Sequence, residues 1–439
     1  MYTSYIGKKF LKIYNERMHT SLSACDFFEQ VFFPLFFNDD RHLMHVSNSP
    51  FFQKPRSEDV KKYGSKPLAQ FHNLQEAIAG DEPNMSIFVG YAAKDSGGTT
   101  SGQVSDIHAS IDANEMYASW IGEALAIGVS GGFVMLIDEP EVLWHLFRGW
   151  EIYRKYLNQT PAIKDKQIET WNGHWLCHGC EESFNAQSPE RGFYITPVEV
   201  KGRLAIQSGL WLSVVMALSL KYPRKTITAY VYNLSQTNTT LGFINIYLPE
   251  IHSLFDLRDR LFVDAAETIL SDKAIEALEP YYTFKSACKL GTIGLRAIEP
   301  DKLRQYLPVG SMPYAQGKDY KFSDRESYLK YELYKIWMIA MINKTELMEQ
   351  ATKIARALIE FENTSENGRT VFSVLSKEIR KASKLDTLVN KLKEVIAYEP
   401  ANADVFRNMV KEVLVMPADK FPLFIALIDF EYVYWKSKN

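Results

Sequence analysis

The stretch 226-TITAYVYNLSQTNTTLGFINIYL-248 contains two runs rich in β-branched, aromatic and other apolar residues, separated by a polar segment. Runs of this composition, bounded by turn-forming residues, are typical of β-strands. The hydroxyl and amide side chains over 235–240 predict the turn between the two runs. We therefore expect strands over 226–234 and 242–248 that pair as a β-hairpin, and this hairpin makes a sheet part of the fold.

The sequence on either side of this hairpin predicts further strands and helices. Helical patterns, with apolar residues three and four positions apart, occur at 4–36, 115–128, 140–157 and 203–220. Strand patterns occur at 86–92, 133–138 and 192–201. From about residue 322 to the end, long helical patterns dominate.

These patterns predict an α/β or α+β N-terminal portion with a mixed sheet, followed by an all-α C-terminal domain. A chain of 439 residues is long enough for more than one domain. We expect a mixed α/β region over 1–165, a second α/β region over 166–320 and a helical domain over 321–439.

The composition is that of a globular chain, since 46% of the residues are hydrophobic and can bury sizeable cores. The 50 basic and 53 acidic residues give a net charge of −3, which excludes a globally basic coat protein but not a local basic groove. Four cysteines are too few for a disulfide scaffold, and the charged N-terminal residues lack the apolar core of a signal peptide. We expect a cytoplasmic protein without a membrane segment.

Candidate catalytic residues lie where the predicted strand 192–201 ends. Glu199 and Lys201 are two positions apart, so on one strand they point to the same face. A carboxylate can hold Mg²⁺, and a neighbouring ammonium can orient water and balance phosphate charge. The pair therefore favours metal-dependent cleavage of a phosphodiester, with a solvated ion pair at a strand end as the alternative.

The stretch 190–234 resembles the PD-(D/E)xK nuclease core of the RecB-like branch. The likeness rests on Glu199-Val200-Lys201, followed by a predicted helix in which Gln207 comes four residues before Trp211. It implies that Gln207 orients the site and that an upstream acid completes the Mg²⁺ site. Glu190, after Pro189, is the first candidate for that acid; the alternatives are Glu169, Glu181, Glu182 and Asp138.

A second candidate metal site lies at 171-WNGHWLCHGC-180. Cys177, Cys180 and His174 have the ligand types and spacing that Zn²⁺ accepts. No second Cys-x-x-Cys pair follows, so the alternative is two free thiols in a tight turn packed by Trp171 and Trp175.

Two basic clusters are candidates for binding nucleic acid. The first falls at i, i+3, i+4 and i+7, which on one helix forms a single stripe able to follow phosphates, and consists of Lys377, Arg380, Lys381 and Lys384. The second lies beside an aromatic pair and consists of Lys54, Arg56, Lys61 and Lys62. The alternative for the stripe is the solvated face of an amphipathic helix.

Together these features predict a prokaryotic protein that acts on DNA or RNA. The first hypothesis is a Mg²⁺-dependent endonuclease, and so a hydrolase, of an antiviral defence system. The second is a non-catalytic nucleic-acid-binding subunit of a multi-protein defence complex, such as the large subunit of a CRISPR surveillance complex. The third is a protein-interaction scaffold.

Overall fold

The computed structural model describes residues 1–46, 48–80, 82–91, 111–234, 240–261, 270–364 and 369–438. The chain forms two compact units, Met1–Leu248 and Pro249–Asn439. It is mostly helical (58%), with a five-strand mixed sheet in the middle region and only helices after residue 325. The predicted combination of a mixed sheet and a helical C-terminal region is therefore confirmed. Within the described ranges, no helix is both long and apolar enough to cross a bilayer.

The first unit opens with an aromatic core. Helix α1 (Tyr2–Met18) is followed by α2 (Ala24–Phe27), one π-helical turn (Phe28–Phe32) and α3 (Phe33–Phe36), which confirms the helical pattern predicted there. Every phenylalanine from 27 to 37 is buried. Their rings pack on Trp120 and Trp150, so this segment anchors the unit.

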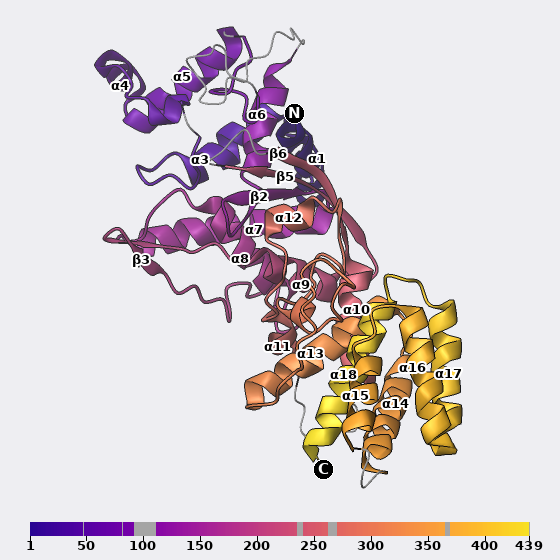
Figure 1. Cartoon of the computed structure of the whole chain (residues 1–439). Helices are drawn as coiled ribbons and strands as arrows, with labels where there is room; N and C mark the ends of the chain where they lie inside the picture. Colours follow the sequence, from indigo (N-terminus) through magenta and orange to yellow (C-terminus); the bar gives the residue numbers. More distant parts are fainter. Residues whose placement is uncertain are drawn as a thin grey trace. The chain divides into compact units, whose positions relative to one another are not determined.

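This unit has further helices, not all of which lie on the sheet (Figure 1). They are α4 (Ser57–Tyr63), α5 (Lys66–Gly80), α6 (Ala113–Glu123), α7 (Pro140–Gln159), α8 (Ile168–Cys180) and α9 (Trp211–Lys221), with a 3₁₀ turn at Pro50–Phe52. Helices α4 and α5 extend to the upper left of Figure 1. Helices α1 and α6 cross at two glycines: a Cβ on Gly7 would lie 1.8 Å from the Ala118 carbonyl oxygen, and one on Gly122 1.9 Å from that of Thr3.

The strands of the first unit pair antiparallel in the order β1 (Ile127–Val129), β2 (Phe133–Ile137), β5 (Thr226–Asn233), β6 (Thr240–Tyr247). The predicted hairpin is confirmed, with Tyr230 opposite Phe243, although its turn residues 235–239 lie outside the described part. Buried residues alternate with exposed or half-buried ones along β5. The hairpin thus has one face in the core and one face open.

Two sequence predictions are wrong in this unit. Residues 86–91 form turns instead of a strand, because the backbone and side-chain oxygens of Asn84 accept hydrogen bonds from the amides that follow it. Ile87 and Phe88 are nevertheless buried in the core. The predicted strand 192–201 is reduced to β3 (Val198–Val200), which pairs with β4 (Arg203–Ala205) where a helix was expected.

In its described residues the second unit has helices, the short strand β7 (Thr292–Ile293) and 3₁₀ turns at Leu303–Gln305 and Pro400–Asn402, and the chain between Lys289 and Asp324 is mostly turns and irregular segments. Its helices are α10 (Leu248–Leu261), α11 (Asp272–Glu276), α12 (Phe284–Cys288), α13 (Arg325–Ile342), α14 (Glu346–Asn363), α15 (Arg369–Arg380), α16 (Leu385–Tyr398), α17 (Ala403–Val415) and α18 (Phe421–Lys438). Helix α18 is buried from Phe421 to Tyr432 and forms the centre of the bundle.

Candidate functional site

Glu199 and Lys201 do not share one face of a continuous strand. Lys201 and Gly202 have φ of +52° and +77°, and Val200 pairs with Arg203 across them. Two consecutive left-handed residues between paired strands make a type I′ hairpin turn, for which the glycine is the sequence signal. Glu199 therefore lies on β3 and Lys201 at the hairpin tip, and both are exposed. The predicted strand geometry is wrong at this point.

Gln207 does not lie on a helix, because α9 begins only at Trp211. The preceding segment is held extended by the Gln167 side chain, which donates to the Ile206 carbonyl (2.9 Å) and accepts from the Ile206 amide (3.2 Å). The Gln207 carbonyl lies 2.7 Å from Nε2 of His174. The strand–helix order that the resemblance implies is therefore not formed at Glu199–Trp211.

The acids proposed to hold Mg²⁺ are dispersed. Within the described ranges, no three His, Cys, Asp or Glu side chains gather as metal ligands. Glu190 lines a groove on the surface of α7 and α8 instead. Asp138 pairs with Lys9 and accepts a hydrogen bond from Tyr5 (3.0 Å), and Glu169 is buried. The arrangement of these acids does not fit the Mg²⁺ site that the resemblance implies.

The candidate zinc ligands Cys177, Cys180 and His174 all lie on α8. Burial raises the pKa of the Cys180 thiol to about 12, which disfavours the thiolate that zinc binds. His174 faces the Gln207 carbonyl. The neighbouring His178 is engaged at both ring nitrogens, with Glu181 at 3.1 Å and the Pro189 carbonyl at 3.0 Å. These contacts tie the end of α8 to the chain that follows it.

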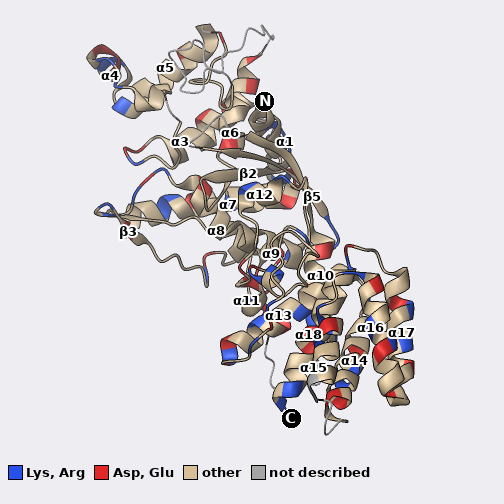
Figure 2. Ribbon diagram, in the orientation of Figure 1, with Lys and Arg blue, Asp and Glu red and all other residues tan. Residues whose placement is uncertain are grey.

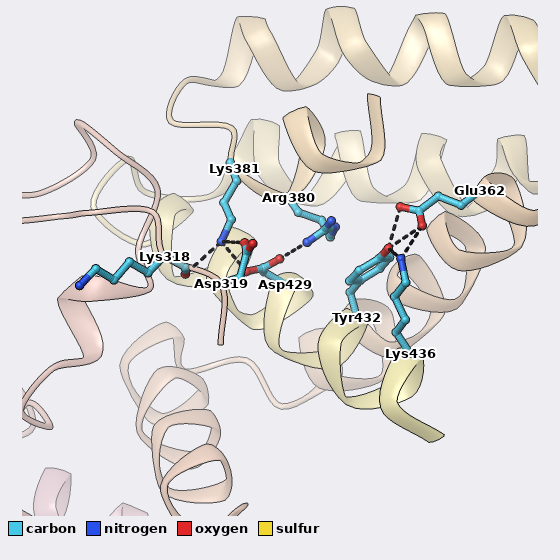
Figure 3. A network of polar contacts seen from close by, with 8 residues as sticks. All are labelled: Lys318, Asp319, Glu362, Arg380, Lys381, Asp429, Tyr432 and Lys436. Atoms are coloured by element: carbon cyan, nitrogen blue, oxygen red, sulfur yellow. Dashed lines mark hydrogen bonds and ion pairs between the residues drawn. The ribbon is translucent and has the colours of Figure 1, made fainter. Parts of the chain in front are cut away.

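The predicted stripe of Lys377, Arg380, Lys381 and Lys384 is wrong, because α15 ends at Arg380 and Lys384 precedes α16. Arg380 and Lys381 both turn toward Asp429 on α18 (Figure 3). The Lys381 ammonium lies 2.6 Å from Asp429 and 3.1 Å from Asp319. The charges of Arg380 and Lys381 hold the bundle together, and only Lys377 and Lys384 of the four are exposed.

The other basic cluster is accessible. Lys54, Arg56, Lys61 and Lys62 are all exposed, and α4 has no buried residue. Its first turn also carries Glu58 and Asp59, so the helix shows both charges (Figure 2). The Lys62 ammonium lies 4.6 Å from the centre of the Tyr63 ring. This helix can supply cations to an anionic partner, although Glu58 and Asp59 reduce its net positive charge.

A partly exposed aromatic cluster, in which Tyr5 and Phe243 are exposed and Tyr2 and Tyr230 half-buried, is the feature that sequence reasoning missed. We call it the aromatic platform, and it consists of Tyr2 and Tyr5 from α1, Tyr230 from β5 and Phe243 from β6. The Tyr2 ring centre lies 5.3 Å from that of Tyr5, 5.2 Å from Tyr230 and 5.0 Å from Phe243. Phe243 is 63% exposed, and the four rings with Met1 line a hollow of about 420 Å³.

The open face continues along the hairpin with neutral polar side chains. Thr226 stands opposite Tyr247, and Thr228 stands opposite Asn245, with 3.2 Å between their side-chain oxygens. The six positions alternate in sequence, at 226, 228, 230 and 243, 245, 247, which is the period of one strand face. That alternation is the sequence signal that could have predicted the open face of the hairpin. It does not predict that α1 packs beside this face.

Two buried carboxyls, Glu123 on α6 and Glu169 on α8, have raised pKa values. Burial raises the pKa of Glu123 to about 7, although the Tyr232 hydroxyl donates to this carboxylate. Burial, together with the nearby charge of Glu123, raises the pKa of Glu169 to about 8. Both groups therefore retain protons at a pH where exposed glutamates are ionised.

This pair predicts that stability falls as pH rises from about 4.5 to about 8. In that window the unfolded chain has released protons that the folded chain retains, so unfolding is favoured. Each carboxyl can contribute up to about 1.4 kcal/mol per pH unit. Urea unfolding across the window should show this slope, and Glu123→Gln should reduce it while keeping an acceptor for Tyr232.

The exposed Glu16→Gln serves as the matched control for this pH series, because its side chain is 65% accessible. Its slope should equal that of the unsubstituted protein. A stability that stays level or rises through the same pH window would contradict the assignment of retained protons to Glu123 and Glu169.

No family model matches the chain, and neither the curated proteins nor the solved structures include a match.

Proposed function

We propose that this chain binds single-stranded nucleic acid across the open face of β5 and β6, and that it does so without cleaving the strand. The aromatic platform carries this proposal. Tyr230 and Phe243 are directly opposed on neighbouring strands, with ring centres 5.2 Å apart. Soluble proteins rarely leave such a group of rings accessible unless it serves a binding role.

The chemistry of this face suits unstacked bases. Aromatic side chains can stack on any base, so a platform of this kind holds a strand with little sequence preference. The hydroxyl and amide groups of Thr228, Asn245 and Tyr247 can bond to sugar or phosphate oxygens without adding charge. The exposed cations near α4, at Lys54, Arg56, Lys61 and Lys62, can supply the electrostatic share of binding.

This reading corresponds to the non-catalytic class among the functions predicted from the sequence. It also accounts for the near-neutral net charge, because stacking needs no large basic surface. The predicted endonuclease would instead need Glu199, Lys201 and a grouped set of acids, and no such group forms within the described residues. Further subunits remain compatible with strand binding.

The double variant Tyr230→Ala with Phe243→Ala tests the proposal. Each lost base-stacking contact is worth about 1–3 kcal/mol, so the pair should weaken binding roughly 30-fold or more. Fluorescence anisotropy with short labelled DNA and RNA strands of mixed sequence would measure the change, at one fixed salt concentration. Phe243→Trp should retain or improve binding, because it keeps a stacking ring.

Tyr398→Ala is the matched control, since this tyrosine is 59% exposed and lies in the second unit. It should bind like the unsubstituted protein. Equal affinity of the double variant would overturn the proposal. Running the same strands with Mg²⁺ or with chelator tests the rival function: Mg²⁺-dependent cleavage that disappears in Lys201→Ala would support the endonuclease instead.

A further inference from the structure

A second concave surface of the first unit lies between α7, α8 and the extended chain at 190–195. Four positions of α7 fall at i, i+3, i+4 and i+7 and line one wall, namely Ile152, Lys155, Tyr156 and Gln159. Glu190, Phe193 and Ile195 line the opposite wall, and Trp171 of α8 closes the base. The groove has a volume of about 500 Å³, within the range of small-molecule sites.

The lower part of this groove is aromatic. The Tyr156 ring centre lies 5.4 Å from that of Trp171, and the Phe193 ring meets Trp171 edge-on at 5.1 Å. Trp171 is 1% exposed, and its indole N–H donates to the Gly149 carbonyl at 3.1 Å, so it is a fixed floor. Tyr156 and Phe193 are half-buried and leave ring surface accessible for a planar ligand.

The rim of the groove is polar and carries both charges. Lys155, Gln159 and Glu190 are exposed. Among the ion pairs of the described chain, none involves Lys155 or Glu190, so both charged ends are available to a ligand. A carboxylate accepts hydrogen bonds only, an ammonium donates only, and a carboxamide does both.

We propose that this groove binds a nucleotide whose base carries an exocyclic amino group. The base lies against Tyr156 and Phe193, its amino group donates to the Glu190 carboxylate, and Gln159 bonds a ring nitrogen or carbonyl of the same edge. Lys155 contacts the phosphate. The groove offers aromatic surface, an acceptor and a cation, which match the base, the amino donor and the phosphate that such a nucleotide presents together. This site is separate from the aromatic platform and goes beyond the proposed strand binding.

Isothermal titration of the full chain with AMP, CMP and UMP, and with adenosine, tests this assignment. AMP and CMP should bind saturably, and UMP should bind about tenfold more weakly because it has no amino group for Glu190. Adenosine should bind more weakly than AMP because it lacks the phosphate. Short DNA and RNA strands that compete with AMP would show that the nucleotide can come from a strand, whereas no competition would assign the site to free nucleotides.

Variants of the rim separate the contacts. Lys155→Ala should weaken the binding of AMP about tenfold and leave the binding of adenosine unchanged, because only the phosphate contact is lost. Glu190→Gln should reduce the preference for AMP over UMP, because an amide can also donate to a carbonyl. The matched controls are Lys353→Ala and Glu349→Gln, an exposed pair on α14, and both should bind AMP normally.

Equal binding of AMP and UMP, or AMP binding that Lys155→Ala and Glu190→Gln leave unchanged, would overturn the assignment. So would the absence of saturable heat with AMP and CMP at millimolar concentration. The double variant at Tyr230 and Phe243 should still bind AMP. Loss of strand binding in this variant with AMP binding intact is the result that both proposals predict. Unchanged strand binding would overturn the proposal for the aromatic platform alone, and absence of AMP binding to the unsubstituted protein would overturn the proposal for the groove alone.

Discussion

Replacing Gly122 by alanine is expected to destabilise the first unit by about 3 kcal/mol or more, because the added methyl has no space. The new Cβ would lie 1.9 Å from the Thr3 carbonyl oxygen on α1. That obstacle is backbone, which cannot rotate away as a side chain would. Helices α1 and α6 must therefore separate, and the packing of both helices is lost along the crossing.

Urea unfolding followed by tryptophan fluorescence would measure this effect, since Trp120 lies on α6 two residues from the substitution. Gly80→Ala is the matched control: a Cβ there meets nothing within 4 Å, so the same change should be neutral or slightly stabilising. Because α1 carries Tyr2 and Tyr5, Gly122→Ala should also weaken strand binding. Unfolding midpoints that agree for Gly122→Ala and Gly80→Ala would contradict the close crossing.

The elements that the sequence predicted well are those whose pattern is local. The hairpin at 226–247 and the helices after residue 325 follow from apolar spacing within each segment, and both formed where expected. The β3–β4 hairpin also has a local signal, Lys201-Gly202. The β-branched residues before this turn were equally consistent with one long strand, and the apolar run after it was equally consistent with a helix. The turn chemistry favoured the hairpin over both.

The candidate sites were harder to predict because they depend on residues far apart in the chain. Arg380 and Lys381 look like members of a solvated stripe until Asp429, almost fifty positions later, is packed beside them. The aromatic platform needs α1 to lie against β5 and β6, and no spacing within Tyr2–Tyr5 reveals that neighbour. The periodicity of apolar residues predicts which face of an element is buried, but it does not predict which other element packs on that face.

Asp429→Asn is expected to destabilise the second unit by about 3–5 kcal/mol, because it leaves the buried guanidinium of Arg380 without its carboxylate. The Asp429 side chain is 1% exposed and pairs with both Arg380 and Lys381 (Figure 3). Lys381 would keep Asp319, at 3.1 Å. Arg380 would keep the face of the Tyr432 ring, 3.6 Å away, and a neutral amide oxygen at position 429, which together do not replace an ion pair in a desolvated site.

The carboxylate-to-amide change keeps the volume of the side chain, so its cost reports charge and not packing. Glu349→Gln, whose side chain is 81% exposed in a pair with Lys353, is the matched control and should cost less than about 0.5 kcal/mol. Urea unfolding measures both values, and faster hydrogen exchange in α15 and α18 would assign the loss to this bundle. Adding Arg380→Met to Asp429→Asn should recover part of the stability, because it removes the stranded charge. If Asp429→Asn unfolds like Glu349→Gln, the interior charges do not stabilise the bundle, and Arg380 and Lys381 again become candidates for an external partner.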